Sequence, residues 1–345
     1  MKKSFGSSIV ESITGNLAAS IVMALTLVVA VVVGTAGGPS QLINAVVTGG
    51  MWALLAVGLA LVFGVANIPY FAHGESFMIG AYTAFFVFRP IHDYLLENPN
   101  PFLSAVAPFS GIIAATIVGF IVGVILERVL FYPLRRASKP GEWVMNAFLL
   151  TLGISFILIN GLNLVLGPNF RGVPHYWYVD PIVVGQVRVS VERIITLGVT
   201  LAAIGALWFF LRQTRTGRAM RAVAQDEVGA QMVGINLNFI YALTMGLSTS
   251  LAALAGGALL FIFQAYPSVG GTPLYFAWYV VILVGLGNVA GAVAGGFIVA
   301  LLQTATQQFL GIGWSNVVPI AAMVAVLLAV PSGIFGSEVK GVQER

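Results

Sequence analysis

Charged residues in this chain gather in one short stretch, residues 212–227, in a sequence of 345 residues with only 16 lysines and arginines and 12 aspartates and glutamates. The charges in the stretch are Arg212, Arg215, Arg218, Arg221, Asp226 and Glu227. Apolar segments flank it at 193–211 and 239–263. A charged internal segment between two apolar ones indicates a short helix at the water edge of a membrane, suited to docking a partner.

The apolar residues inside the same segment predict its shape. They recur at helical spacing on one face, and they are Met220, Val223, Ala224, Val228 and Met232. An amphipathic helix lying on anionic lipid headgroups would have the same pattern. Asp226, Glu227 and the break at Gly234 favour a protein partner, because a lipid-binding strip would continue as a basic helix.

A second polar cluster lies in an apolar region and reads Asn67-Ile68-Pro69-Tyr70-Phe71-Ala72-His73-Gly74-Glu75. Pro69 removes a helical hydrogen bond, so neighbouring residues must satisfy the freed backbone groups. Glu75 suits a proton carrier or a ligand for a substrate ammonium, since ionisable residues in a membrane are usually functional. The preferred alternative places Glu75 in the first turn of a helix at the cytoplasmic interface, where its charge matches the helix dipole.

No combination of residues predicts catalysis by this chain. It has no cysteine, and its three histidines, His73, His92 and His175, lack metal-ligand spacing. It also lacks the Gly-x-Ser-x-Gly and His-Glu-x-x-His motifs, an aspartate dyad and the Gly-x-x-x-x-Gly-Lys-Ser/Thr nucleotide loop. A membrane-embedded enzyme is therefore disfavoured. If transport is driven by ATP, another subunit must hydrolyse it.

Composition identifies a polytopic membrane protein. Charged residues are 8% and hydrophobic residues 59% of the chain, and the mean hydropathy is +0.97. A soluble domain carries about 25% charge, so these few polar groups would not cover the surface of a globule. The pI near 9.4 is interpreted as basic residues collected in cytoplasmic loops rather than as nucleic-acid binding.

Ten hydrophobic elements are expected from the apolar runs. The long ones are 17–36, 42–66, 104–131, 144–166, 193–211, 239–263 and 288–310, and the shorter ones are 74–88, 274–287 and 317–331. Glycine and proline interrupt several of them, which predicts broken or re-entrant helices. The expected fold is all-α, a polytopic membrane bundle of about 8–10 transmembrane or re-entrant helices.

Basic residues orient the chain. One set of segment ends carries twelve of the 16 lysines and arginines, among them Lys2, Lys3, Lys340 and Arg345, and the other set carries four. The richer set, with both termini, is then cytoplasmic, and loops 89–103 and 167–192 are external. Lys2 and Lys3 before an apolar run also fit a cleaved signal peptide. A retained first helix is favoured, because its apolar core begins far from the first residue.

Small residues recur at every fourth position in two segments. The sets are Gly287, Gly291 and Gly295, and Gly111, Ala115, Gly119 and Gly123. They predict close helix packing, with dimerisation as the less favoured interpretation. The runs 64–67 and 285–288 each end an apolar helix before a glycine-bearing one, a hint of a two-half pseudo-repeat with a binding region near the bilayer midplane.

Four segments together resemble the permease subunits of high-affinity branched-chain amino acid ABC importers, in particular the H-type subunit of the leucine/isoleucine/valine system. The segments are 67–80, 217–236, 284–288 and 330–336. The resemblance runs from about residue 40 to residue 336. It implies an N-terminal helix at 1–40, a permease domain at 41–336 with a cytoplasmic coupling segment at 212–238, and a cytoplasmic tail at 337–345.

The resemblance also implies partners and site residues. The importer would contain a second permease, two cytoplasmic ATPases that hold ATP and Mg, and a periplasmic substrate-binding protein, all at the bacterial inner membrane, and this chain would hold no cofactor. The implied ATPase-coupling residues are Gly217, Arg218, Arg221, Asp226, Glu227 and Gly234. The candidate translocation-path residues are Asn67, His73, Glu75, Asn288 and Gln264.

Two other functions stay open on the sequence. Urea and short-chain amide permeases share this family, and the motifs do not separate their substrates. A secondary transporter that couples flux to ions through Glu75 is the alternative from another class. It is disfavoured because the membrane-embedded segments contain few other acids.

Overall fold

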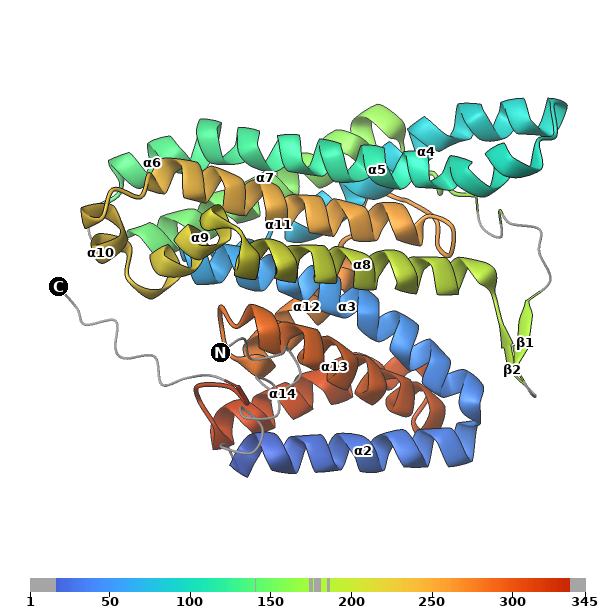
Figure 1. Ribbon diagram of the computed structural model, residues 1–345. Helices are drawn as coiled ribbons and strands as arrows, with labels where there is room; N and C mark the ends of the chain where they lie inside the picture. Colours follow the sequence, from blue (N-terminus) through green and yellow to red (C-terminus); the bar gives the residue numbers. More distant parts are fainter. Residues whose placement is uncertain (1–16, 140, 174–175, 177–180, 185–186, 336–345) are drawn as a thin grey trace. The chain divides into compact units, whose positions relative to one another are not determined.

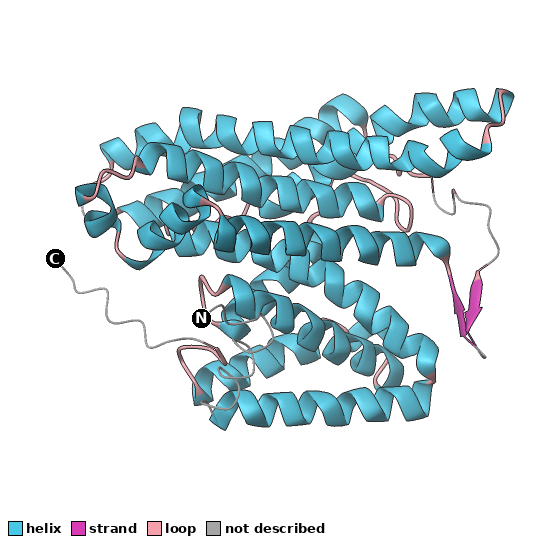
Figure 2. Cartoon of the chain, viewed as in Figure 1, coloured by secondary structure: helices cyan, strands magenta, loops and turns pink. Residues whose placement is uncertain are grey.

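A computed structural model describes residues 17–139, 141–173, 176, 181–184 and 187–335. These residues are almost entirely helical, with one small hairpin of two strands (Figure 2). Within the described part, eight helices are long and apolar enough to cross a membrane. The expected all-α polytopic fold is therefore confirmed. The tail 337–345 and the basic residues Lys2, Lys3, Lys340 and Arg345 lie outside the described residues.

The helices follow the expected apolar segments in order. Their bounds are α2 Leu17–Gly37, α3 Pro39–Ala66, α4 His73–Glu97, α5 Pro101–Leu126, α6 Tyr132–Ala137, α7 Trp143–Leu166, α8 Val191–Gln213, α9 Arg215–Gln225, α10 Glu227–Met232, α11 Leu237–Leu259, α12 Gly271–Val284, α13 Val289–Phe309 and α14 Val317–Ala329. A π-helical turn, η1 (Glu127–Phe131), joins α5 to α6, and a 3-10 turn, η2 (Ile312–Trp314), precedes α14. Strands β1 (Ile182–Val184) and β2 (Val187–Val189) pair antiparallel.

The loop expected at 89–103 is mostly helical. α4 continues through Pro90 to Glu97, and only residues 98–100 connect it to α5. The helix continues because its apolar face stays buried beyond the expected end: Phe88 and Leu95 pack in one core cluster with Phe261. The polar residues of this region occupy the opposite face. They lower the hydropathy averaged along the chain, so an apolar segment read from the sequence ends before the helix does.

Residue contacts divide the chain into two compact units. The first contains residues up to 60, 181–189 and 275 onward, and there α13 packs against α2 and α14. The second contains residues 61–180 and 190–274. Within the second unit, α4, α5 and α11 pack side by side, and α8 and α9 lie against α11 (Figure 1).

Small residues allow the closest of these helix contacts, as the sequence predicted. A Cβ atom on Gly80 of α4 would collide with the Ala253 backbone of α11, and one on Gly256 would collide with the Phe77 carbonyl. On α5, a Cβ on Gly119 would lie 2.8 Å from the Thr249 carbonyl oxygen. Lipid tails are as apolar as leucine, so helices in a membrane associate through such close packing rather than through the hydrophobic effect.

The packing predicts opposite effects for two glycine-to-alanine changes within helices. Gly80→Ala should lower the stability of the detergent-solubilised protein by about 1–3 kcal/mol, because the Ala253 backbone cannot move aside. Gly153→Ala on α7 meets no atom within 4 Å. It should be neutral or gain up to about 1 kcal/mol of helix propensity. Thermal unfolding of both variants tests this; equal melting temperatures would contradict the close contact.

Candidate functional site

The charged segment forms two short helices, α9 and α10, at the same end of the second unit as α6 (Figure 1). Thr214 begins α9, since its hydroxyl accepts a hydrogen bond of 2.9 Å from the Gly217 N–H. Asp226 begins α10, because its carboxylate accepts a hydrogen bond of 3.0 Å from the Gly229 N–H. These are the residue types that satisfy the free N–H groups at helix starts.

Gly234 ends α10 with a backbone φ of +85°, a conformation that glycine adopts without strain. Its N–H bonds to the Gln231 carbonyl at 3.0 Å, and the Ile235 N–H bonds to the Ala230 carbonyl at 3.1 Å. This pair of bonds is the Schellman arrangement that closes a helix C-terminus. The break expected at Gly234 is therefore present and has a backbone cause.

The single apolar helix face predicted for this segment is wrong. Asp226 has extended backbone angles, φ −155° and ψ 104°, so α9 and α10 point their side chains independently. Met220 and Val223 of α9 are buried, whereas Val228 and Met232 of α10 are exposed, the latter at 82%. An aspartate that caps a new helix competes with continuation of the preceding one, which explains the break.

The resulting surface presents cations beside an apolar knob. Exposed on α9 and at the start of α10 are Arg215, Arg218, Arg221, Asp226 and Glu227. Val228, Met232 and Val233 project from α10 with 62–82% exposure. Gly217 is buried instead. It lies so close to α8 that a Cβ atom there would collide with the backbone of Phe210 and Leu211. Of the expected coupling residues, Gly217 and Gly234 thus shape the segment, and the charged ones face outward.

The polar cluster at 67–75 is a break between α3 and α4. Asn67 ends α3 with a positive φ of 51°, a conformation that asparagine tolerates better than most residues. Thr151 of α7 then satisfies the freed backbone groups around Pro69. Its hydroxyl donates to the Pro69 carbonyl at 3.1 Å and accepts from the Phe71 N–H at 3.3 Å. The need for such a partner was predicted, and Thr151 fills it.

Glu75 lies in the first turn of α4 and is only 3% exposed. Ser155 donates a hydrogen bond of 2.8 Å to its Oε1. Ser155 is close to the midpoint of α7, so the carboxyl group lies level with the middle of that helix. The first-turn position expected for Glu75 is present, and its carboxyl group is buried against α7. His73 is fully buried beside it and meets the Tyr70 ring edge-on at 5.8 Å.

Asn288 belongs to the first unit and organises the turn between α12 and α13. Its Oδ1 accepts from the Gly291 N–H at 2.8 Å, and its Nδ2 donates to the Phe335 carbonyl at 2.8 Å. The Ile334 and Phe335 N–H groups bond to the carbonyls of Leu283 and Val284. The amide of Asn288 therefore fastens the 330–335 segment to the end of α12.

The four expected path residues of the second unit do not form one cluster. His73 and Glu75 lie together in the first turn of α4. Asn67 is exposed and ends a helix, and Gln264 is exposed beside Ala265, which packs further along α4 against Tyr82 and Phe85. Asn288 lies in the other unit. Asn67 and Asn288 therefore have structural tasks that their residue type alone explains.

Residues 41–327 match the model of the family described as branched-chain amino acid transport system / permease component. The chain belongs to this family. It is 31% identical over 301 residues, 86% of this chain and 94% of the other, to the high-affinity branched-chain amino acid transport system permease protein LivH of Salmonella typhimurium. It is 30% identical over 303 residues, 86% and 95%, to the permease protein BraD of Pseudomonas aeruginosa.

A further relative is the probable branched-chain amino acid transport permease protein LivM of Methanocaldococcus jannaschii, at 25% identity over 274 residues, 71% of this chain and 75% of the other. No solved structure matches the chain. Two of the segments that carried the family resemblance, 284–288 and 330–336, meet in the first unit through the bonds of Asn288 and Phe335. The other two, 67–80 and 217–236, belong to the second unit.

Sequence reasoning missed one buried pair in this permease. Glu127 at the end of α5 is 1% exposed, and its carboxylate meets Arg135 of α6 at 2.9 Å. A lone acid at the end of a long apolar run is the signal that could have found it, because such an acid needs a named partner. Its spacing of eight residues from Arg135 fits no regular helical pair, which hid the partner.

The cap at Asp226 predicts a local change that separates geometry from charge. Asp226→Ala should weaken α10 by about 1 kcal/mol and raise amide exchange there about fivefold. Asp226→Asn keeps the capping oxygen and should leave exchange near that of the parent protein, since asparagine caps as well as aspartate. Hydrogen exchange of peptides spanning 226–235 measures both. Fast exchange in Asp226→Asn as well would mean that the cap does not hold α10.

Proposed function

We propose that this chain is a permease subunit of an ATP-driven importer and forms half of the translocation path for branched-chain amino acids. Membership of the family and the names of its LivH and BraD relatives support the substrate class. The observation that carries the proposal for this chain is the exposed pair α9 and α10, two capped helices with charged and apolar side chains facing outward.

The α9–α10 surface is proposed to dock a cytoplasmic ATPase subunit. A groove that accepts Val228, Met232 and Val233 would bury their exposed apolar area, and a polar rim would meet Arg218 and Arg221. Two such ATPases would supply the ATP and Mg, while this chain holds no cofactor and performs no catalysis. Their closure would move α9 and α10 and turn the path from inward-open to outward-open.

The charge distribution in the second unit supports the orientation of this proposal. The end that holds α6 and α9 (Figure 1) carries Arg135 and Arg136 of α6, the arginines of α9 and Arg212 in the last turn of α8, whereas Arg193 lies in the first turn of α8, at its opposite end. The arginine-rich end, and with it both termini, is proposed to be cytoplasmic in a bacterial inner membrane. A periplasmic binding protein would then deliver substrate at the opposite side.

A second permease completes the proposed path. The chain matches relatives of both the LivH and the LivM type, so two such chains are similar enough to pair as copies or paralogues. Substrate would pass between the two subunits past apolar side chains. The binding protein would select it beforehand, so this chain does not itself need high specificity.

The complex is tested by purifying this chain from its native membrane in mild detergent and assaying whatever ATPase accompanies it. We expect a co-purifying ATPase whose turnover rises with binding protein plus leucine. A rise only with urea or a short amide would overturn the substrate and keep the importer. Absence of any ATPase, with the chain folded, would overturn the importer and favour ion-coupled transport.

The docking surface predicts uncoupling by changes in α9 and α10. Arg218→Ala, Asp226→Ala or a bulky residue at Gly234 should reduce substrate-stimulated ATP hydrolysis about tenfold, as loss of an interface anchor does. Membrane insertion should be unchanged, because these residues face outward from the bundle. Stimulated ATPase activity and uptake in proteoliposomes measure the effect. Normal coupling in all three variants would remove the docking assignment.

Glu75 separates the importer from the ion-coupled alternative. Glu75→Gln keeps an acceptor for the Ser155 hydroxyl and removes the proton carrier. In an ATP-driven importer we expect substantial uptake to remain, insensitive to ionophores. Ser155→Ala serves as the control for loss of the hydrogen bond alone. Complete loss of uptake in Glu75→Gln, with normal assembly and normal uptake in Ser155→Ala, would show that the carboxyl group itself carries transport.

A further inference from the structure

Arg135 lies where the α5 helix is distorted. η1 at Glu127–Phe131 is a π-helical turn, closed by the Tyr132 N–H on the Glu127 carbonyl. Pro133 gives a physical reason, because a proline ring clashes with the carbonyl four residues earlier and donates no hydrogen bond. The wider turn relieves that clash. Single π-turns inside helices occur often at functional sites.

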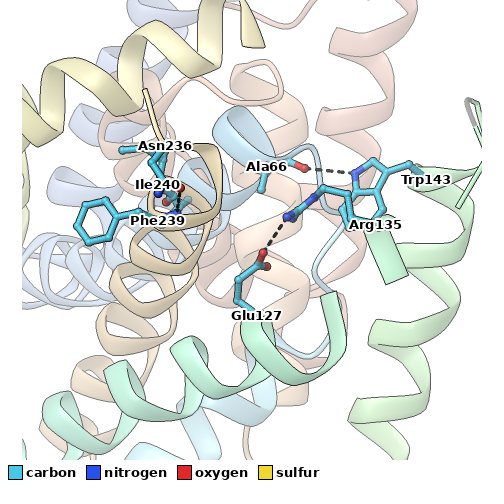
Figure 3. A network of polar contacts seen from close by, with 8 residues as sticks. Ala66, Glu127, Arg135, Trp143, Asn236, Phe239 and Ile240 are labelled. Carbon is cyan, nitrogen blue, oxygen red and sulfur yellow. Dashed lines mark hydrogen bonds and ion pairs between the residues drawn. The ribbon is translucent and has the colours of Figure 1, made fainter. Parts of the chain in front are cut away.

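The guanidinium of Arg135 contacts three side chains, of which Figure 3 shows Glu127 and Trp143. Its Nη1 donates to Glu127 Oε1 at 2.9 Å. Its Cζ lies 4.0 Å from the centroid of the Tyr241 ring and 4.7 Å from that of Trp143. A planar cation between two aromatic faces and a carboxylate has few alternative positions, so it moves with its neighbours.

One of these neighbours reaches the coupling segment. Tyr241 is in the second turn of α11, and α11 follows α10, which begins at Glu227, after the connection 233–236. The α9 helix of the same segment also packs against α11. Glu227 itself is exposed on the surface proposed to dock the ATPase. A displacement of α10 therefore acts on the ring that contacts Arg135.

The other neighbour reaches the break between α3 and α4. The Trp143 indole Nε1 donates to the Ala66 carbonyl at 3.4 Å (Figure 3). Ala66 is the last residue of α3, and Asn67 follows it with a positive φ. The residues of this chain of contacts all belong to the second unit, as do His73 and Glu75 beyond the break.

We propose that Arg135 is a positioning residue that transmits movement of the coupling segment to the break after α3, through Tyr241 of α11 on one side and through Trp143 and Ala66 on the other. The proposal rests on the importer function above and deepens it. ATPase closure shifts α10, Tyr241 carries the shift to Arg135, and Trp143 carries it to the carbonyl at the end of α3. The π-turn is the place where the α5–α6 helix bends during this movement.

Conservative variants in the complete, reconstituted importer test the proposal. Arg135→Lys keeps the charge and loses the planar group that stacks on both rings. Trp143→Phe keeps a ring and loses the Nε1–H, and Tyr241→Leu keeps an apolar side chain and loses the ring that contacts Arg135. Arg136→Lys is the matched control, because the neighbouring Arg136 is exposed and stacks only on Tyr132 of its own helix among the described contacts.

We expect each of the three path variants to keep its ATPase bound and its basal hydrolysis, while stimulation by leucine-loaded binding protein and uptake fall about three- to tenfold. Arg136→Lys should match the parent. The effects of Arg135→Lys and Trp143→Phe should also be less than additive, since these two side chains are in direct contact.

Coupling in Arg135→Lys equal to that in Arg136→Lys, in an assembled complex, would overturn the transmission role and leave the importer intact. If Arg135→Lys fails to fold, normal coupling in Trp143→Phe and Tyr241→Leu would likewise overturn it and give Arg135 a purely structural role. A parent complex without an ATPase would overturn the importer itself, and the transmission role with it.

Discussion

Close backbone contact among α4, α5 and α11 is the constraint on which the second unit depends. Gly80 and Gly256 allow the α4 and α11 backbones to touch, and Gly119 brings α5 against the same face of α11. In lipid, packing of this kind replaces the hydrophobic effect as the force that joins helices. It also fixes the positions of Glu75 on α4 and of Tyr241 near the start of α11. The buried carboxyl group and the link to α10 both follow from these small residues.

Where helices stop inside an apolar environment, the chain supplies side-chain partners for freed backbone groups. Thr151 serves the break at Pro69, and Asn288 serves the break after α12 by bonding to Phe335. Asn67 and Gly234 provide the positive φ angles that end α3 and α10. An unsatisfied peptide group costs several kcal/mol in hydrocarbon, about as much as a whole helix contact contributes. Irregular backbone is therefore tolerated only where such side chains bond to its free N–H and C=O groups.

Apolar runs and capping residues were enough to predict the order of the helices, the breaks near 67 and 285, and the stop at Gly234. The extension of α4 to Glu97 was not predictable from a hydropathy window, because its buried residues Phe88 and Leu95 are separated by polar ones on the opposite face. The split at Asp226 was missed because an aspartate within a charged run reads equally well as helix surface or as cap. The contact of Ser155 with Glu75, across two helices, required the tertiary structure.

Glu127 and Arg135 show why a buried ion pair at the α5–α6 junction points to function more than to stability. Removing two charges from water costs about as much as their attraction returns, so apolar residues of the same size would hold the junction equally well. The pair leaves Glu127 almost fully buried, beside a π-turn that itself weakens the helix. What the pair provides is a fixed position for the guanidinium group. A guanidinium held by Glu127, Tyr241 and Trp143 transmits displacement from one helix to another, which leucine or methionine side chains, free to change rotamer, would absorb.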